Sequence, residues 1–173
     1  MTSKCYWITG LSATGKTTFS TLLVNHFRST GKQIIQLDGD ELRQVLADEE
    51  YTREERIALG MRYARLCHLI SSQGGDVVIA VIGLFKEIHK WNRENIPNYI
   101  EIIIDTPLDE LIRRDPKGLY KRYISGEINN IAGMDLKIDY PEDPDIHIKW
   151  SNGRSVESMF DELLRKCINI VKE

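Results

Sequence analysis

The chain has 173 residues, of which 42% are hydrophobic and 28% are charged, and it carries a formal net charge of −3. This length and composition predict one globular domain, residues 1–173, whose core is large enough to fold without disulfides or a structural metal. The slightly acidic balance argues against a protein that coats nucleic acid or an anionic membrane, but it is compatible with a small basic cleft for a small anion.

The first third of the chain alternates strand and helix. A short β-branched and aromatic run over 5–9 predicts a strand that ends at Gly10. Apolar residues then recur at helical spacing and predict a helix that ends near Gly31; they are Phe19, Leu22, Leu23 and Phe27. Residues 33–37 predict a second strand, which ends at the sequence Asp38-Gly39-Asp40.

The middle third continues the alternation. The residues Thr52 to Glu55 have the spacing of a capping box and predict the start of a long helix, which Gly74-Gly75 ends. Residues 76–82 are nearly all apolar, as expected of a central parallel strand that is buried on both faces. A helix is predicted over 86–95, and a further strand over 99–104.

The last third contains a long segment without clear periodicity. A helix is predicted from Thr106-Pro107 to a break at Asp115-Pro116. Residues 117–144 are rich in Gly, Asn, Pro and charge, and a segment of this kind is usually a functional lid or disordered. A strand over 145–149 and an amphipathic helix complete the chain. The repeated alternation predicts an α/β fold with a doubly wound parallel sheet.

The cysteines and the apolar runs bear on the cellular compartment. Cys5, Cys67 and Cys167 are far apart and include no C-x-x-C pair, which disfavours a disulfide framework or a zinc site. Reduced thiols are typical of the cytoplasm, so a cytoplasmic protein is expected. No apolar run approaches the roughly 18 residues of a membrane-spanning helix, and the segment before the first strand is too short and polar for a signal peptide.

One motif predicts nucleotide binding. Residues 10–17 match the phosphate-loop pattern G-x-x-x-x-G-K-[ST] in full, after a predicted strand and before a predicted helix; they are Gly10, Leu11, Ser12, Ala13, Thr14, Gly15, Lys16 and Thr17. Backbone N–H groups of such a loop point at nucleotide phosphates. Lys16 is expected to neutralise the β- and γ-phosphates, and the Thr17 hydroxyl to hold Mg²⁺. The pattern favours MgATP binding over a chance match in a glycine turn.

The residues after the second strand are candidates for binding a phosphoryl acceptor. Asp38-Gly39-Asp40 lies at the sheet edge where open α/β sheets bind ligands, so a carboxylate there could orient a hydroxyl or help to hold Mg²⁺. Alternatively, one aspartate caps the next helix. Arg43, Arg56 and Arg62 could bind phosphate or sulfate oxygens, or could form a solvated helix face. Tyr51 is either a stacking platform or a packing residue.

Three stretches together resemble the adenylylsulfate kinase family, small P-loop kinases that phosphorylate the 3′-hydroxyl of adenosine 5′-phosphosulfate. They are residues 10–18 with 37–43, residues 105–108, and residues 114–120, and residues 126–133 continue in register. The resemblance spans nearly the whole chain. It implies a nucleoside-monophosphate-kinase-like fold with a mobile helical lid at about 115–135, and a homodimer as one candidate oligomeric state.

Carried over position by position, the resemblance also implies roles for individual residues. Asp40 would lie beside the 3′-hydroxyl and share Mg²⁺ with Thr17, and Lys117 would be the lid lysine that reaches both substrates; with Lys16 they would form the catalytic set. ATP binding would extend to Thr18 and Arg114. The acceptor would contact Asp38, Asp40, Arg43, Tyr51, Arg56, Ile82, Gly83, Leu84, Lys86, Lys117 and Ile131.

The chain departs from the family pattern on the acceptor side. The family usually reads Ile-Ser-Pro-Tyr-Arg where this chain has Ile-Gly-Leu-Phe-Lys over 82–86. The serine that some members phosphorylate is absent at Gly83, and Lys86 lacks the bidentate fork of the arginine that it replaces. Gly60 stands where the family usually has an asparagine, and Ile131 where it has a second stacking phenylalanine. Losing one face of such a sandwich would remove about 1–3 kcal/mol of base stacking.

Three functions are compatible with these residues. The first is an adenylylsulfate kinase of sulfate assimilation. The second keeps the reaction but changes the acceptor to another nucleotide with a substituted 5′-phosphoryl group, such as the cytidine diphosphoramidate used by capsule-pathway relatives. The third, from another class, is a nucleotide-dependent regulatory switch, although Asp38-Gly39-Asp40 is not the D-x-x-G of such switches. All three have small-molecule nucleotide ligands rather than nucleic acid or membrane partners.

Overall fold

The computed structural model of the chain describes residues 3–48 and 51–172. For residues 171 and 172 it describes the backbone only. The strands are β1 (Cys5–Thr9), β2 (Ile34–Asp38), β3 (Asp76–Ala80), β4 (Tyr99–Asp105) and β5 (Ile146–Lys149). The helices are α1 (Lys16–Ser29), α2 (Gly39–Val45), α3 (Arg53–Ser72), α4 (Lys86–Asn95), α5 (Leu108–Arg114), α6 (Leu119–Ile124) and α7 (Val156–Lys172).

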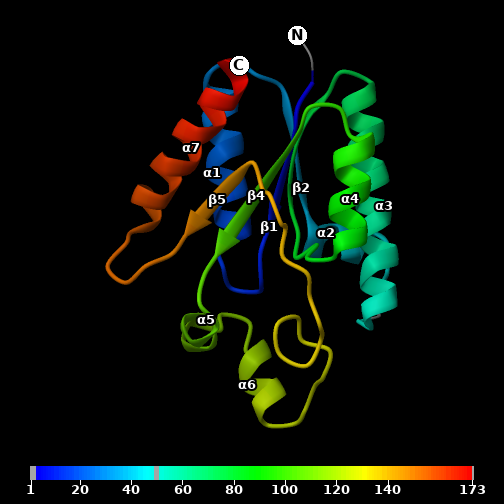
Figure 1. The fold of residues 1–173 in the computed structure, drawn as a ribbon, viewed down its shortest axis with the longest axis vertical. Coiled ribbons are helices and arrows are strands. Elements are labelled where there is room, and N and C mark those ends of the chain that lie inside the picture. The colour runs from blue at the N-terminus through cyan, green and yellow to red at the C-terminus, as the bar shows by residue number, and fades with distance from the viewer. Residues whose placement is uncertain (1–2, 49–50, 173) are drawn as a thin grey trace.

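All of these strands run parallel in one sheet, in the order β2-β3-β1-β4-β5 (Figure 1). The central strand β1 pairs Cys5 with Val77 of β3 on one side and with Tyr99 of β4 on the other. Because the strand order reverses beside β1, crossover helices cover both faces, which confirms the predicted doubly wound sheet. The carboxyl ends of the strands therefore meet at a single edge, where the phosphate loop leaves β1.

Helices cover both faces of the sheet (Figure 1). Helices α1 and α7 lie on one face, where Phe19 and Leu23 of α1 are buried. Helices α3 and α4 lie on the other face, where Tyr63 and Ile88 pack into the cluster that contains Trp7 of β1. Burial of each large apolar side chain contributes about 1.5–3 kcal/mol to the stability of the folded state. None of the helices in the described ranges combines the length and apolar character needed to cross a membrane.

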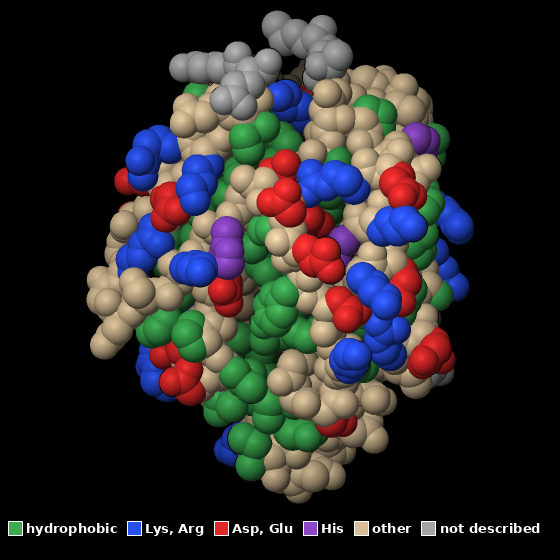
Figure 2. Space-filling model, viewed as in Figure 1, with side chains coloured by type: hydrophobic (Ala, Val, Ile, Leu, Met, Phe, Trp, Pro, Cys, Tyr) green, Lys and Arg blue, Asp and Glu red, His purple; other side chains and the backbone are tan. Residues whose placement is uncertain are grey.

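Residues 115–135, here called the lid segment, lie beyond the carboxyl edge of the sheet and include α6 (Figure 1). On the face drawn in Figure 2, hydrophobic side chains gather in the lower half of the view, where α5 and α6 lie. Acidic and basic side chains are interspersed over the rest of that face, which therefore presents no extended basic surface.

Two short helices were not predicted from periodicity. Helix α2 has seven residues and none of them is buried, so it has no apolar stripe to detect. Helix α6 has six residues and buries only Tyr120. In addition, β3 ends at Ala80 rather than at residue 82, because the chain turns there toward the left-handed backbone of Gly83 (φ 48°).

The capping box that begins α3 is confirmed and allows a test of stability. Thr52 Oγ1 accepts a hydrogen bond from Glu55 N at 3.4 Å, and Glu55 Oε2 accepts one from Thr52 N at 3.2 Å. We expect Thr52→Ala to lower the free energy of unfolding by about 1 kcal/mol, or about 2–4 °C in Tm for a chain of this size. Ser72→Ala, at the other end of α3, is the control. Equal melting temperatures for both variants would contradict the prediction.

Candidate active site

The phosphate loop follows β1 and has a backbone that few residue types adopt. Gly10 has φ 151° and Gly15 has φ 92°, both outside the range that side chains favour. A Cβ on Gly10 would lie 2.6 Å from the carbonyl oxygen of Ile104 in β4, so only glycine fits there. Thr14 N donates to Leu11 O at 3.5 Å and closes the turn. The loop delivers Lys16 and Thr17 to the first turn of α1.

Lys16 points back across the phosphate loop. Its Nζ donates to Leu11 O at 2.7 Å. Burial lowers the pKa of Lys16 to about 8, while the Asp40 and Asp38 charges raise it and the Lys117 charge lowers it. Lys16 therefore experiences the charges of three predicted site residues, which belong to β2, α2 and the lid segment.

The structure assigns different tasks to the two aspartates that follow β2. Asp38 is buried, and its Oδ1 accepts from Asp40 N at 2.9 Å, which caps α2. Its Oδ2 accepts from the Thr17 hydroxyl at 2.7 Å. Asp38 thus faces the phosphate loop rather than the expected acceptor. The capping role suggested by the sequence belongs to Asp38, so the Asp40 carboxylate is left to project outward.

Asp40 forms an ion pair with Lys117 of the lid segment. Both side chains are more than half exposed, so the pair contributes little to stability. The two residues line an open hollow of ≈ 660 Å³ together with Arg43, Gln44, Ala47, Asp48 and Tyr51. This hollow brings together the acidic residue, the lid lysine and part of the predicted acceptor set.

Two arginines lie over the ring of Tyr51, a residue that is 47% exposed. The guanidinium carbon of Arg43 is 4.5 Å from the ring centroid, and that of Arg56 is 5.2 Å from it. Arg56 also donates to Tyr51 O at 3.0 Å and to Asn130 O of the lid segment at 2.9 Å. Burial and the Arg43 charge lower the pKa of Arg56. The ring is an exposed platform rather than a core residue.

Arg43 and Arg62 share one carboxylate. Arg43 Nη1 lies 2.7 Å from Asp48 Oδ1, and Arg62 Nη1 lies 3.4 Å from Asp48 Oδ2. Arg43 is thereby held at the hollow, whereas the Arg62 side chain is 58% exposed beside it. Asp48 was not singled out from the sequence.

Arg114 lies against the outer side of the phosphate loop. Its Nη1 donates to Ala13 O at 3.4 Å, and its guanidinium carbon is 5.3 Å from the Trp150 ring centroid. Glu110 Oε1 accepts from Arg114 Nε at 2.8 Å. Hydrogen bonds from Arg113 and then Arg114 lower the pKa of Glu110 to about 2. The sequence did not single out Glu110 or Trp150, since neither belongs to a recognisable motif.

The loop after β3 does not present all of its predicted acceptor residues. The Leu84 side chain is fully buried in the core, so it cannot contact an acceptor in this conformation. Ile82 contributes its carbonyl oxygen, which accepts from the Thr9 hydroxyl. Gly83 lies against Trp7, where a Cβ would come within 3.2 Å of Nε1. The Lys86 side chain is exposed at the start of α4.

Two further departures from the family pattern lie inside packed regions. Gly60 is buried in α3, and a Cβ there would lie 2.3 Å from Ile88 Cδ1 of α4. Helix packing against Ile88 thus fills the space beside Gly60, and the loss of a polar acceptor contact at this position stays a prediction. Ile131 is also buried, and its N–H donates to Asp135 Oδ1 at 2.8 Å. In this conformation Ile131 packs within the lid segment.

The oxygen groups near the phosphate loop suit Mg²⁺ that arrives with a nucleotide. Within residues 3–48 and 51–172, no cluster of three or more His, Cys, Asp or Glu side chains could hold a metal by itself. Mg²⁺ usually takes one or two carboxylates and completes its shell with phosphates and water. The Thr17 hydroxyl and the Asp38 and Asp40 carboxylates fit such partial coordination.

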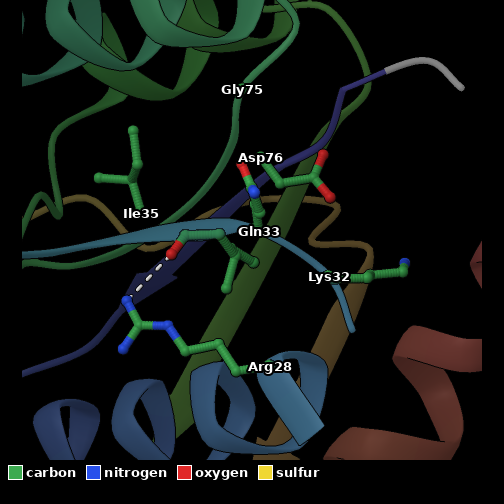
Figure 3. Close-up of a pocket in the computed structure, with 7 residues that line it drawn as sticks. Arg28, Lys32, Gln33, Ile35, Gly75 and Asp76 are labelled. Atoms are coloured by element: carbon green, nitrogen blue, oxygen red, sulfur yellow. Dashed lines mark hydrogen bonds between the residues drawn. The ribbon is translucent and has the colours of Figure 1, made fainter. Parts of the chain in front are cut away.

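A second hollow, of ≈ 420 Å³, lies at the opposite edge of the sheet (Figure 3). It is at the amino ends of β2 and β3, and its lining includes Arg28, Lys32 and Asp76. Arg28 Nη2 donates to Ile34 O at 3.0 Å, and Asp76 Oδ1 accepts from Lys4 N at 2.7 Å. These polar groups already have partners, and the hollow is remote from the phosphate loop.

Comparison with known proteins adds a family and a reaction class. Residues 2–149 match the family model for adenylylsulphate kinase. Cytidine diphosphoramidate kinase of Campylobacter jejuni is 38% identical over 160 residues, covering 92% of this chain and 94% of that protein. A probable adenylyl-sulfate kinase of Pseudomonas aeruginosa is 35% identical over 161 residues, covering 92% and 75%. The Mycobacterium tuberculosis APS kinase solved with AMPPNP and APS superposes with a TM-score of 0.86 at 30% identity, covering 99% and 98%.

Proposed function

Because the chain belongs to the adenylylsulphate kinase family and is therefore a phosphotransferase, we propose that it transfers the γ-phosphoryl group of ATP to the 3′-hydroxyl of a nucleotide whose 5′-phosphoryl group is substituted. The observation that carries this proposal is the Asp40–Lys117 pair in the hollow that also holds Arg43 and Tyr51. An acidic group, a mobile cation, an anion-binding arginine and a stacking ring are the groups that such an acceptor requires.

Donor binding is assigned to the phosphate loop. The backbone N–H groups of residues 10–17 and the N-terminus of α1 bind the phosphates, and Lys16 neutralises their oxygens. Thr17 and Asp40 would hold Mg²⁺ that enters with ATP, with Asp38 fixing the Thr17 hydroxyl. When bound, this ion would supply positive charge that offsets the negative charge of the phosphates during transfer. Arg114, which contacts both Ala13 of the loop and the Trp150 ring, would bind the rest of the donor.

Acceptor binding is assigned to the hollow beside α2. Tyr51 stacks on the base, and Arg43 and Arg56 bind the acceptor's phosphoryl oxygens. Asp40 then exchanges its contact with Lys117 for the 3′-hydroxyl, which it orients for in-line attack. Lys117, released from Asp40, follows the transferring group and neutralises its charge. Closure of the lid segment excludes water and limits wasteful hydrolysis of ATP.

Two acceptors are supported by different observations. Relatives named adenylyl-sulfate kinase, and the similarity to an APS kinase solved with APS, support adenylylsulfate. The Campylobacter relative, which matches over nearly its full length, supports cytidine diphosphoramidate. Tyr51 provides a single aromatic face and the buried Ile131 provides none, which suits a smaller pyrimidine as well as a purine.

An acceptor panel tests this proposal. Purified protein with MgATP is mixed with adenylylsulfate, cytidine diphosphoramidate, CDP or no acceptor, and ADP release is followed. We expect rapid turnover with adenylylsulfate or cytidine diphosphoramidate, and slow turnover with CDP, whose terminal group is an unmodified phosphate. The higher kcat/KM of the first two identifies the preferred acceptor. Equal ADP release with and without acceptors would contradict the proposal and favour a nucleotide-dependent switch.

A further inference from the structure

Residues 136–145, here called the return segment, lead from the lid segment to β5. Asp139 attaches this segment to the loop after β3. Asp139 N donates to Leu84 O at 2.8 Å. Its carboxylate accepts from Arg53 Nη2 of α3 at 2.9 Å and from Lys86 N at the start of α4 at 3.4 Å. One residue of the return segment is therefore bonded to α3, to α4 and to the loop between β3 and α4.

The backbone of Asp139 is also attached to a buried polar cluster. Asp139 O lies 3.2 Å from His89 Nε2, and His89 Nδ1 lies 2.9 Å from Glu101 Oε1. Glu101 is only 3% exposed and also accepts from Tyr99 OH at 2.9 Å. The contacts of Asp139 thus reach the core strand β4, which gives this point of the return segment a rigid support.

The Asp139 carboxylate is held in its charged form. Partial burial alone would raise the pKa of Asp139, but the Lys86 N–H and the Arg53 guanidinium offset this and lower it. Arg53 is itself held by its stacking on Phe85, with 5.4 Å from the guanidinium carbon to the ring centroid. The charged hydrogen bonds at Asp139 are therefore directional and specific rather than a diffuse surface attraction.

The loop that Asp139 holds borders the catalytic groups. The carbonyl oxygen of Ile82 accepts from the Thr9 hydroxyl, directly before the phosphate loop. A Cβ on Gly39, between the two aspartates, would lie 3.1 Å from Val81 Cγ1. A shift of residues 81–85 would therefore disturb both the base of the phosphate loop and the turn that carries Asp40.

The lid segment reaches the same region from the other side. Lys117 pairs with Asp40, and Asn130 O accepts from Arg56. The chain then passes through Asp139 before it enters β5. Asp139 is thus the point at which the end of the lid-bearing segment meets the loop that packs against Gly39, next to Asp40.

We propose that Asp139 is a positioning residue for phosphoryl transfer, which fixes the loop 82–85 to the segment returning from the lid so that the two sides of the acceptor site keep one relative placement. It contacts no substrate itself. The inference rests on the proposed kinase function for its kinetic consequences, but its structural part can be measured without any acceptor.

Asp145 offers a matched control at the other end of the same return segment. Its Oδ2 accepts from Glu101 N at 2.7 Å and from Arg93 Nη1 at 2.6 Å. It is also an aspartate with a guanidinium and a backbone N–H as partners, but its contacts lead to β4 and the end of α4 rather than to the loop after β3. Loss of either carboxylate removes similar hydrogen bonds, and only Asp139 is joined to the acceptor side.

The kinetic test compares Asp139→Ala with Asp145→Ala. We expect Asp139→Ala to raise the acceptor KM by about tenfold, the scale of one lost charge-assisted hydrogen bond, and to raise the ATP KM by a smaller factor. Asp139→Asn, whose amide oxygen can still accept from Lys86 N, should recover part of the loss. Asp145→Ala should lower Tm without changing the ratio of the two KM values. Equal KM ratios in the two alanine variants would overturn the proposal.

The acceptor-free test is hydrogen exchange of the substrate-free protein. Asp139→Ala should speed exchange of the Lys86 amide and of residues 82–85, whereas Asp145→Ala should leave them unchanged. Unchanged exchange in Asp139→Ala overturns the inference whichever acceptor is used. If the unmodified protein turns over none of the acceptors but the exchange difference is present, the kinase proposal and the kinetic role of Asp139 are overturned. The structural attachment by Asp139 then still holds. If Asp139→Ala does not fold, Arg53→Gln removes the same ion pair and is measured in its place.

Discussion

Lys16→Ala is expected to abolish turnover with every acceptor. Lys16 extends across the phosphate loop, and its Nζ lies 2.7 Å from Leu11 O. This position places its charge where the terminal phosphates of ATP would bind. Removing one group that stabilises transition-state charge typically costs about 10²–10³ in kcat. Because Lys16 acts on both the bound phosphates and the transferring group, we expect kcat to fall by at least about 10³-fold, measured as ADP release with saturating acceptor.

The environment of Lys16 explains why no neighbour can replace it. Burial lowers its pKa to about 8, so it is mostly charged at neutral pH, and the nearby Asp40 charge favours the charged form. Lys117 is bound to Asp40 and belongs to the lid segment, so it cannot occupy the same position. Lys32→Ala, at the remote hollow of Figure 3, is the matched control and should retain full activity. A Lys16→Ala enzyme that keeps most of its activity would refute the assigned role.

The fold was largely predictable because its main elements have strong local signals. The helix over 86–95 has the bounds that were predicted, and the Thr52–Glu55 box begins α3 as expected. The strand β3, apolar apart from Asp76, lies inside the sheet, between β2 and β1. By contrast, α2 buries none of its residues and α6 buries one, so the hydrophobic pattern on which the prediction depended is absent from them.

The site was predictable only where chemistry is concentrated in a short stretch. The spacing of Gly10, Gly15 and Lys16 is a local requirement of phosphate binding, so it can be recognised in the sequence. Asp139 acts through partners that folding brings close, such as the distant Lys86 N–H. Glu110 and Arg114 have the i,i+4 spacing of a helical ion pair, a signal that the prediction did not use. Leu84 shows the opposite case. Its place in a family motif predicted an acceptor contact, but the fold buries its side chain.

Asp40→Asn is expected to reduce phosphoryl transfer far more than ATP binding. The Asp40 side chain is 65% exposed in the hollow and pairs with Lys117, while Asp38 supplies the cap of α2. Asparagine preserves the size of the side chain but removes the charge that orients the 3′-hydroxyl and accepts its proton. General-base catalysis contributes typically 10²–10⁴-fold, so we expect kcat to fall by about 10²-fold or more. The ATP dissociation constant, measured by calorimetry, should rise by a smaller factor, because residues 10–17 still bind the phosphates and only one of the proposed Mg²⁺ ligands is changed.

Glu41→Gln provides the control for this result, since Glu41 is the next residue in the first turn of α2 and its side chain is exposed. Both substitutions remove one negative charge near the helix N-terminus, where each acidic group stabilises the helix by about 0.3–1 kcal/mol. A loss of activity that merely reflects the helix dipole would therefore appear in both variants. If Asp40→Asn weakens ATP binding while kcat is preserved, Asp40 is a structural or nucleotide-binding residue, and the acceptor hydroxyl must be oriented by another group.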